Sequence, residues 1–144
     1  MNAAISSAAV VVRRTIAASA EELFDAWLDP QALVEWMRPG GIQRTEARND
    51  ARVGGQYEIV MHAESGPIPH RGEYRLIDRP RKLVFTWNSK FAENTLVTID
   101  FFKRDARTEV VITHEQLPEA ELGSHTRGWT SALEKLEQFR STAA

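Results

Sequence analysis

The stretch HTRGWTSALEKLEQF, residues 125–139, decides how the rest of the chain has to fold. Counting from Leu122, the positions of one face recur at 122, 125/126, 129, 132/133, 136 and 139. This spacing forms a single stripe on an α-helix of about twenty residues. A helix with such a stripe has to bury it against a second layer of structure. The sequence therefore predicts a long C-terminal helix that covers a broad apolar surface.

Gly128 and Trp129 are neighbours on the buried side of this predicted helix. Glycine costs a helix interior about 1 kcal/mol relative to alanine. We therefore expect Gly128 to let the helix approach a strand or loop without an intervening Cβ. On this interpretation Gly128→Ala overpacks the contact and destabilises the fold by about 1–3 kcal/mol. Trp129 then points into the space under the helix, either as core packing or as the wall of a ligand cavity.

Two shorter helices are predicted after a first strand over residues 9–16. Ser19 can cap the first of them, and acidic residues follow in its first turn, where the helix dipole favours negative charge. Pro30 separates this helix from the second, PQALVEWM, residues 30–37. Proline lacks the N–H that a helix interior needs and disfavours helical geometry in the preceding residue. We therefore predict two helices that meet at a bend, not one continuous helix over residues 19–37.

The middle of the chain reads as a series of strands separated by turn residues. Short alternating apolar segments at this spacing indicate an antiparallel meander. The predicted strands are QYEIVMH (56–62), HRGEYRLI (70–77), KLVFTWN (82–88), TLVTIDFF (95–102) and TEVVITHEQL (108–117).

The order of these elements predicts an α+β helix-grip fold as one domain over residues 8–141. In it, a curved antiparallel sheet of about six to seven strands wraps around the C-terminal helix, and the two short helices follow the first strand. Sheet and helix rarely close completely in this arrangement, so we expect a cavity between them.

Composition excludes several classes of partner. The 144 residues are 42% hydrophobic and 26% charged, as in an ordinary globular domain, and the net charge of -2 offers no basic field for nucleic acid. The absence of cysteine excludes disulfides and cysteine-ligated metals. No apolar run approaches the roughly 20 residues of a membrane helix, and none resembles a signal peptide. We expect a cytoplasmic protein, a monomer or homodimer, with no cofactor and no membrane insertion.

The aromatic residues are the strongest candidates for a binding site, because aromatic walls with few polar groups hold apolar small molecules. The same residues can equally fill a core. The predicted cavity is lined by Trp36, Tyr57, Ile59, Tyr74, Phe85, Trp87, Val97, Ile99, Ile112, His114, His125, Trp129 and Leu133.

Histidines are the candidates for catalysis, and none of their spacings fits a metal site. His114 shares one strand face with Val110 and Ile112, so it either faces the cavity or ends the strand as a hydrogen-bonded, half-exposed residue. His125 lies one helical turn before Trp129 and could meet His114 across the cavity mouth. His114 and His125 are therefore weak catalytic candidates.

Three charged residues carry further expectations. Strand alternation places Glu73 outside the sheet beside Arg75, and it turns Asp100 toward solvent. Arg14 shares a face with the buried positions of the first strand. It is expected at the cavity rim, in a pair with a carboxylate, or simply exposed at the sheet edge.

The ordered motifs also resemble a known family. The segments RTIAASAEELFDAWLDPQALVEWMRP, VGGQYEIVM, HRGEYRLIDRPRKLVFTWN, TLVTIDFF, TEVVITHEQLP and H..GW...LEKL follow one another over residues 10–140. This order is similar to that of START-like (SRPBCC) proteins named after the activator of the heat-shock protein 90 ATPase. The resemblance implies the helix-grip fold and a cavity, not one reaction.

Three functions follow as hypotheses. The first is binding of a hydrophobic or amphipathic small molecule, such as a lipid, in the cavity. The second is an enzyme of the cyclase, dehydratase or hydrolase type that acts on an apolar ligand, with His114 as the first candidate acid or base. The third, suggested by the family name, is an interaction protein that activates a chaperone ATPase, which needs an exposed apolar patch or charged docking face.

Overall fold

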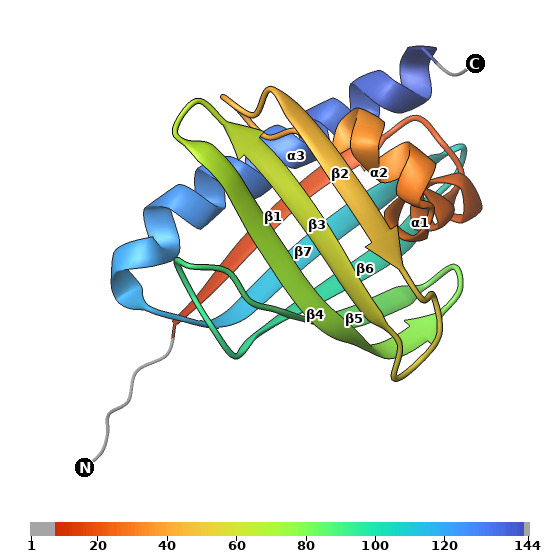
Figure 1. Cartoon of the computed structure of the whole chain (residues 1–144). Helices are drawn as coiled ribbons and strands as arrows, with labels where there is room; N and C mark the ends of the chain where they lie inside the picture. Colours follow the sequence, from red (N-terminus) through yellow and green to blue (C-terminus); the bar gives the residue numbers. More distant parts are fainter. Residues whose placement is uncertain (1–7, 143–144) are drawn as a thin grey trace.

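The computed structural model describes residues 8–142, and Figure 1 shows their arrangement. The elements follow the predicted order of strand, two short helices, a run of strands and a long helix. They are β1 (Ala8–Ile16), α1 (Ala20–Leu28), α2 (Pro30–Trp36), β2 (Arg44–Asn49), β3 (Gln56–Ala63), β4 (Gly66–Asp78), β5 (Lys82–Trp87), β6 (Thr95–Arg104), β7 (Arg107–Leu117), the 3-10 helix η1 (Glu119–Glu121) and α3 (Leu122–Thr142).

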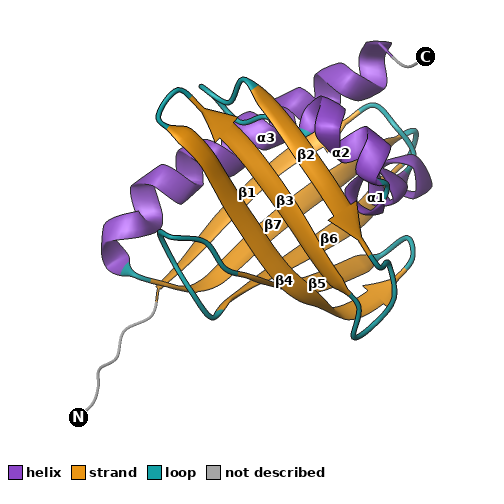
Figure 2. Cartoon of the chain, viewed as in Figure 1, coloured by secondary structure: helices purple, strands orange, loops and turns teal. Residues whose placement is uncertain are grey.

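The strands form one antiparallel sheet in the order β1-β7-β6-β5-β4-β3-β2. The sheet is strongly curved, so that in Figure 2 the strands β2, β3 and β4 lie across β1 and β5–β7. Helix α3 packs against β1 and α2 on the concave side. The predicted helix-grip architecture is thus confirmed. None of the helices in residues 8–142 is both long enough and apolar enough to cross a membrane.

The two short helices form as predicted, and local chemistry explains their limits. The Ser19 hydroxyl accepts from the backbone N–H of Glu22, whose carboxylate in turn accepts from the Ser19 N–H. This reciprocal pair is a capping box, which satisfies two N–H groups that the helix leaves free. Asp29 adopts an extended backbone between the helices, and α2 begins at Pro30. The predicted break at the proline is therefore confirmed.

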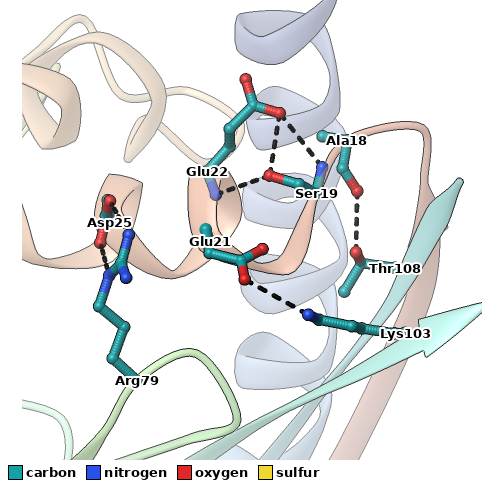
Figure 3. Close-up of polar contacts among 8 residues, drawn as sticks. All are labelled: Ala18, Ser19, Glu21, Glu22, Asp25, Arg79, Lys103 and Thr108. Carbon is teal, nitrogen blue, oxygen red and sulfur yellow. Dashed lines mark hydrogen bonds and ion pairs between the residues drawn. The ribbon is translucent and has the colours of Figure 1, made fainter.

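Polar contacts connect α1 and the residues before it to the β4–β5 turn and to strands β6 and β7 (Figure 3). Asp25 makes a two-pronged ion pair with Arg79 at 2.8 and 2.9 Å, and Lys103 reaches Glu21 at 3.3 Å. The hydrogen bond from Arg79 lowers the pKa of the Asp25 carboxyl. The Thr108 hydroxyl donates to the Ala18 carbonyl at 2.8 Å and ties the chain before α1 to β7. This end of the molecule is closed by paired groups.

Strand β4 is longer than the predicted segment 70–77, because it begins at Gly66. Pro67 and Pro69 lie within it and pair with β3. The Arg71 N–H, which has the same parity as the prolines, donates to Asn88 on the β5 side. At the two proline positions the backbone edge that would carry an N–H therefore faces away from β3. On that side, this part of β4 has no neighbouring strand, so no ladder hydrogen bond is lost. That geometry lets prolines occupy a strand.

The close-approach role predicted for Gly128 is wrong. A Cβ built at Gly128 meets nothing within 4 Å, so the helix passes over open space at this position. The glycine that does permit close approach is Gly72, where a Cβ would overlap the Thr86 carbonyl and lie 2.7 Å from the Tyr57 ring. The prediction failed because a glycine on the buried side of a helix is compatible with an empty space beneath the helix as well as with a tight contact.

Candidate functional site

A pocket of about 730 Å³ lies between the N-terminal half of α3, the loop after α2, and the inner side of the sheet. Its exposed lining residues lie in the loop after α2, in the loop between β5 and β6, in η1 and in the first turns of α3, so it opens to solvent there. Its lining residues are Met37, Pro39, Gly40, Ile42, Met61, His70, Trp87, Phe91, Ala120, Glu121, Ser124, His125, Arg127, Gly128, Trp129, Ser131 and Ala132.

The structure divides the predicted lining residues into three groups. Trp87, His125 and Trp129 line the pocket itself. A second group lines a separate void of about 10 Å³ that shares Trp87 and Met37 with the pocket, namely Tyr57, Ile59, Tyr74 and Phe85. The remaining residues are completely buried in the core and do not line the pocket: Trp36, Val97, Ile99, Ile112, His114 and Leu133.

His114 lies directly behind the pocket wall in a chain of hydrogen bonds. The Trp129 indole donates its N–H to His114 Nδ1 at 3.0 Å. His114 Nε2 lies 2.8 Å from the Thr95 hydroxyl, which itself donates to the Trp87 carbonyl at 2.5 Å. Because the hydroxyl proton is used on the carbonyl, Nε2 must carry the imidazole proton. The four residues thus form one relay that joins α3 to β5, β6 and β7.

His114 is neutral in the folded protein. Burial lowers the pKa of His114 to about 3, and the neighbouring His125 ring contributes in the same direction. Both ring nitrogens already have partners within the relay. The arrangement holds the Trp129 indole in one orientation under the helix, which is a positioning role rather than acid–base chemistry.

His125 meets His114 edge to face, with ring centroids 5.2 Å apart. Its Nδ1 lies 2.9 Å from the Glu121 carbonyl one helical turn back. A carbonyl only accepts, so Nδ1 carries a proton, and in the neutral ring the lone pair is therefore on Nε2. The side chain is 13% exposed and lines the pocket. Of the two histidines singled out from the sequence, His125 is the one with a free nitrogen.

His70 is a pocket residue that sequence reasoning missed. Its ring packs on Trp87 with centroids 4.7 Å apart, and its Nδ1 lies 3.3 Å from the Ile59 carbonyl. Burial lowers the pKa of His70 to about 4, so the ring is neutral at physiological pH. The signal was present, since His70 has the same strand parity as Tyr74, which was expected to face inward.

The other residues missed from the sequence come partly from strand alternation and partly from loops. Met61 shares its parity with Tyr57 and Ile59 on β3 and could have been found in that way. Ile42 and Phe91 lie outside the named helices and strands, where no periodicity indicates which side chain turns inward. The loop residues at the pocket mouth could therefore not be predicted from sequence periodicity.

The charged candidates lie outside the pocket lining. Glu73 pairs with Arg75 at 2.9 Å, as expected from its outward parity. Asp100 is also on the outward side, where Lys82 approaches it at 3.5 Å. Arg14 takes the carboxylate alternative and binds Glu137 of α3 at 2.7 Å. Within residues 8–142 no three His, Asp or Glu side chains converge as a metal site would require.

A second depression, of about 680 Å³, lies over β2–β5. Outward-facing charged residues of these strands line it, including Arg48, Glu58 and Arg71. Glu58 binds both arginines, at 2.8 and 3.4 Å. Because these charged groups are already paired with one another and the lining is polar, the apolar pocket under α3 is the stronger candidate site.

Comparison with solved structures finds the same architecture in several bacterial proteins. A protein from Chromobacterium violaceum is 26% identical, with a TM-score of 0.80 over 90% of this chain and 95% of that one. A protein from Rhizobium leguminosarum is 24% identical, with a TM-score of 0.79 over 93% and 94% of the two chains. One from Rhodobacter sphaeroides is 22% identical, with a TM-score of 0.81 over 94% and 93%. A search of curated proteins gives no significant match.

A family model matches residues 17–140, which include both short helices, β2–β7 and most of α3. Its description is activator of Hsp90 ATPase homolog 1-like protein. Proteins of this START-like type typically enclose a ligand-binding cavity, in agreement with the hollow under α3. The match, the order of the motifs and the helix-grip architecture all agree, and the chain belongs to the family of activator of Hsp90 ATPase homolog 1-like proteins.

Proposed function

We propose that this protein binds a hydrophobic or amphipathic small molecule in the pocket under the N-terminal half of α3. The observation that carries the proposal is the pocket itself, about 730 Å³ with a mainly apolar lining. Sites for small molecules are commonly hollows of about 300–1,000 Å³ with apolar walls and a few placed polar groups.

The walls suit a flat or flexible apolar ligand. Trp87 and Trp129 form one wall, with ring centroids 5.0 Å apart. Met37 and Met61 lie in the same lining, and methionine side chains adapt to ligands of different shape. Phe91 is 46% exposed and also lines the pocket, so an entering ligand would cover an aromatic ring that otherwise faces water.

The test is a binding titration with a variant that fills the pocket. Tryptophan quenching by N-phenyl-1-naphthylamine, a neutral apolar probe, would report binding to wild type. Gly128→Leu projects a side chain into the space where a Cβ meets nothing within 4 Å. We expect binding at least roughly tenfold weaker in this variant, with the unfolding midpoint preserved, because the new side chain occupies the ligand volume.

Thr130→Leu is the matched control, since Thr130 is exposed on the same helix and does not line the pocket. It should bind the probe as wild type does. Equal binding by Gly128→Leu and wild type would place the probe elsewhere. No response to a panel of lipids, aromatics and polyketides would end the proposal.

A second candidate function, catalysis on a bound apolar ligand, is favoured by one observation. His125 has its Nδ1 held by the Glu121 carbonyl, which leaves Nε2 as a proton acceptor in a residue that lines the pocket. A histidine held in one tautomer is a suitable general base. Screening p-nitrophenyl esters of increasing chain length would test this. Turnover that His125→Gln abolishes supports it, whereas turnover that survives the substitution does not.

A further inference from the structure

Arg127 differs from most arginines of this chain in having no ionic partner. Arginines elsewhere bind carboxylates, as Arg14 binds Glu137 and Arg79 binds Asp25. Arg127 makes no ion pair with any residue in the described part of the chain, although it lines the pocket. An unpaired guanidinium at a binding pocket has its hydrogen-bond donors available for a ligand.

The position of the guanidinium is known from its contact with the first turn of α3. Its Nη1 lies 3.4 Å from where a Cβ on Gly123 would be. The side chain therefore folds back along its own helix, over Gly123, rather than extending away from the protein. Gly123 and Ser124 are both exposed, and Ser124 also lines the pocket. Arg127 is itself exposed and lines the pocket, so its charge lies where the pocket meets solvent.

One carboxylate lies in the same lining, but it makes its contacts with groups other than Arg127. Glu121 is the carboxylate among the lining residues, and it accepts from the Ser124 hydroxyl at 3.0 Å and lies 3.6 Å from His125 Nδ1. Lys90 is not a lining residue, but its Nζ lies 5.4 Å from the ring centroid of Phe91, which lines the pocket. A ligand anion at Arg127 would therefore meet an unpaired guanidinium, and the carboxylate of the lining already has hydrogen-bonding partners.

Among the well-buried lining residues there is no carboxylate, lysine or arginine. The titratable side chains there are His70, which is 7% exposed and packs on Trp87, and His125, whose side chain is 13% exposed. Taking an unpaired charge into such surroundings costs several kcal/mol. The inner part of a ligand must therefore be uncharged, and any charge that it carries has to stay at the mouth.

We propose that the pocket is specific for apolar carboxylic acids, whose hydrophobic body enters between Trp87 and Trp129 while the carboxylate pairs with Arg127 at the mouth. This inference rests on the proposed binding function and names its ligand class. Arginine suits the role because its planar fork matches a carboxylate with two parallel N–H···O bonds. Arg127 then determines the preference for acids, and the apolar walls supply the part of the affinity that acids and uncharged ligands share.

The experiment compares acids with their neutral amides on the same apolar bodies. Calorimetric titration at pH 7.5 would use 2-naphthoic acid, 1-pyrenebutyric acid and dodecanoic acid, each beside its primary amide. In wild type we expect at least one acid to bind roughly fivefold or more tightly than its amide, and less so at high salt. Arg127→Gln should weaken binding of the acid much more than binding of its amide, so that the two affinities become about equal.

Arg107→Gln is the matched control, because Arg107 is exposed at the start of β7, far from the lining in sequence and not part of it. It should keep the preference for acids, and Arg127→Lys should keep part of it. Equal binding of acids and amides by wild type would overturn the specificity while leaving the pocket function intact. Failure of every acid and every amide to bind would overturn the pocket function itself.

Discussion

The two halves of α3 perform different tasks on the same sheet. In the C-terminal half, Leu133 and Leu136 are completely buried and Glu137 is bound by Arg14. In the N-terminal half, Ser124 and Gly128 lie over the pocket. The amphipathic stripe continues through both halves, yet leucines fill the space under one half, whereas in the other half Ser124 and Gly128 accompany Trp129 around a pocket. An unbroken stripe thus shows which way a helix faces, but not whether the space beneath it is filled.

The hollow half compensates for its missing contacts with a polar relay. Trp129, His114 and Thr95 are joined by hydrogen bonds behind the pocket wall. Buried polar groups with all their partners in place fix a single arrangement, whereas an unsatisfied group is costly. The closed half relies on close packing, and the open half relies on directed bonds. The following predictions test that contrast.

The largest effect is expected in the closed half. Leu136→Ala removes a completely buried side chain and leaves a cavity, so we expect the free energy of unfolding to fall by about 2–5 kcal/mol. Urea denaturation followed by circular dichroism measures this. Lys135→Ala, exposed on the same turn, should change stability by less than about 0.5 kcal/mol. A small loss for Leu136→Ala would mean that this half is not close-packed.

Acid should weaken the open half. The pKa of folded His114 is lowered to about 3, below the ordinary value of 6.5. Above pH 6.5 its contribution is complete. Below that, the unfolded chain binds a proton that the folded protein does not, so stability falls until the folded group also titrates. At pH 5 the loss is about 2 kcal/mol for this histidine, with a similar loss from His70.

Urea denaturation between pH 7 and 5 measures the combined effect of the two buried histidines, and most of the contribution from Asp25 and the other carboxyls with lowered pKa falls at lower pH. His114→Gln offers an amide that can donate and accept but does not titrate. It should reduce the dependence of unfolding free energy on pH by up to about 1.4 kcal/mol per unit. An unchanged slope would show that folded His114 becomes protonated.

Gly128→Ala tests directly whether the space under α3 is empty, and it is expected to stabilise the protein, unlike the preceding substitutions. Because the added methyl group meets nothing within 4 Å, helix propensity acts without overpacking. We expect the free energy of unfolding to rise by up to about 1 kcal/mol, observed as a higher melting temperature. Destabilisation instead would show that the helix approaches the sheet more closely than in this structure.

The smallest effect is expected for the surface ion pair at the closed end. Asp25 and Arg79 are both about half exposed, with side-chain exposures of 55% and 52%. A double-mutant cycle with Asp25→Asn and Arg79→Gln should give a coupling below about 1 kcal/mol that decreases with added salt. A larger, salt-independent coupling would mean that this contact, and not the buried leucines, closes that end.

The architecture was readable from the sequence because its signals are local. Ser19 with Glu22, and Asp29 with Pro30, determine helix limits through bonds within a few residues. Strand alternation correctly predicted that Glu73 lies outside the sheet, and it would also have indicated His70. Each of these inferences depends on geometry that one segment imposes on itself.

The pocket required the tertiary structure. Gly128 has the same place on the stripe whether it meets a strand or open space, and only the distance between helix and sheet distinguishes the two. His114 acquires its neutral state and its partners from strand register, which sets it opposite Val97 and brings Thr95 and Trp129 to its two nitrogens. A pattern of residues specifies which side chains turn inward. How separate elements pack together decides whether those side chains fill the interior or leave a gap between them, and such a gap is what creates a binding site.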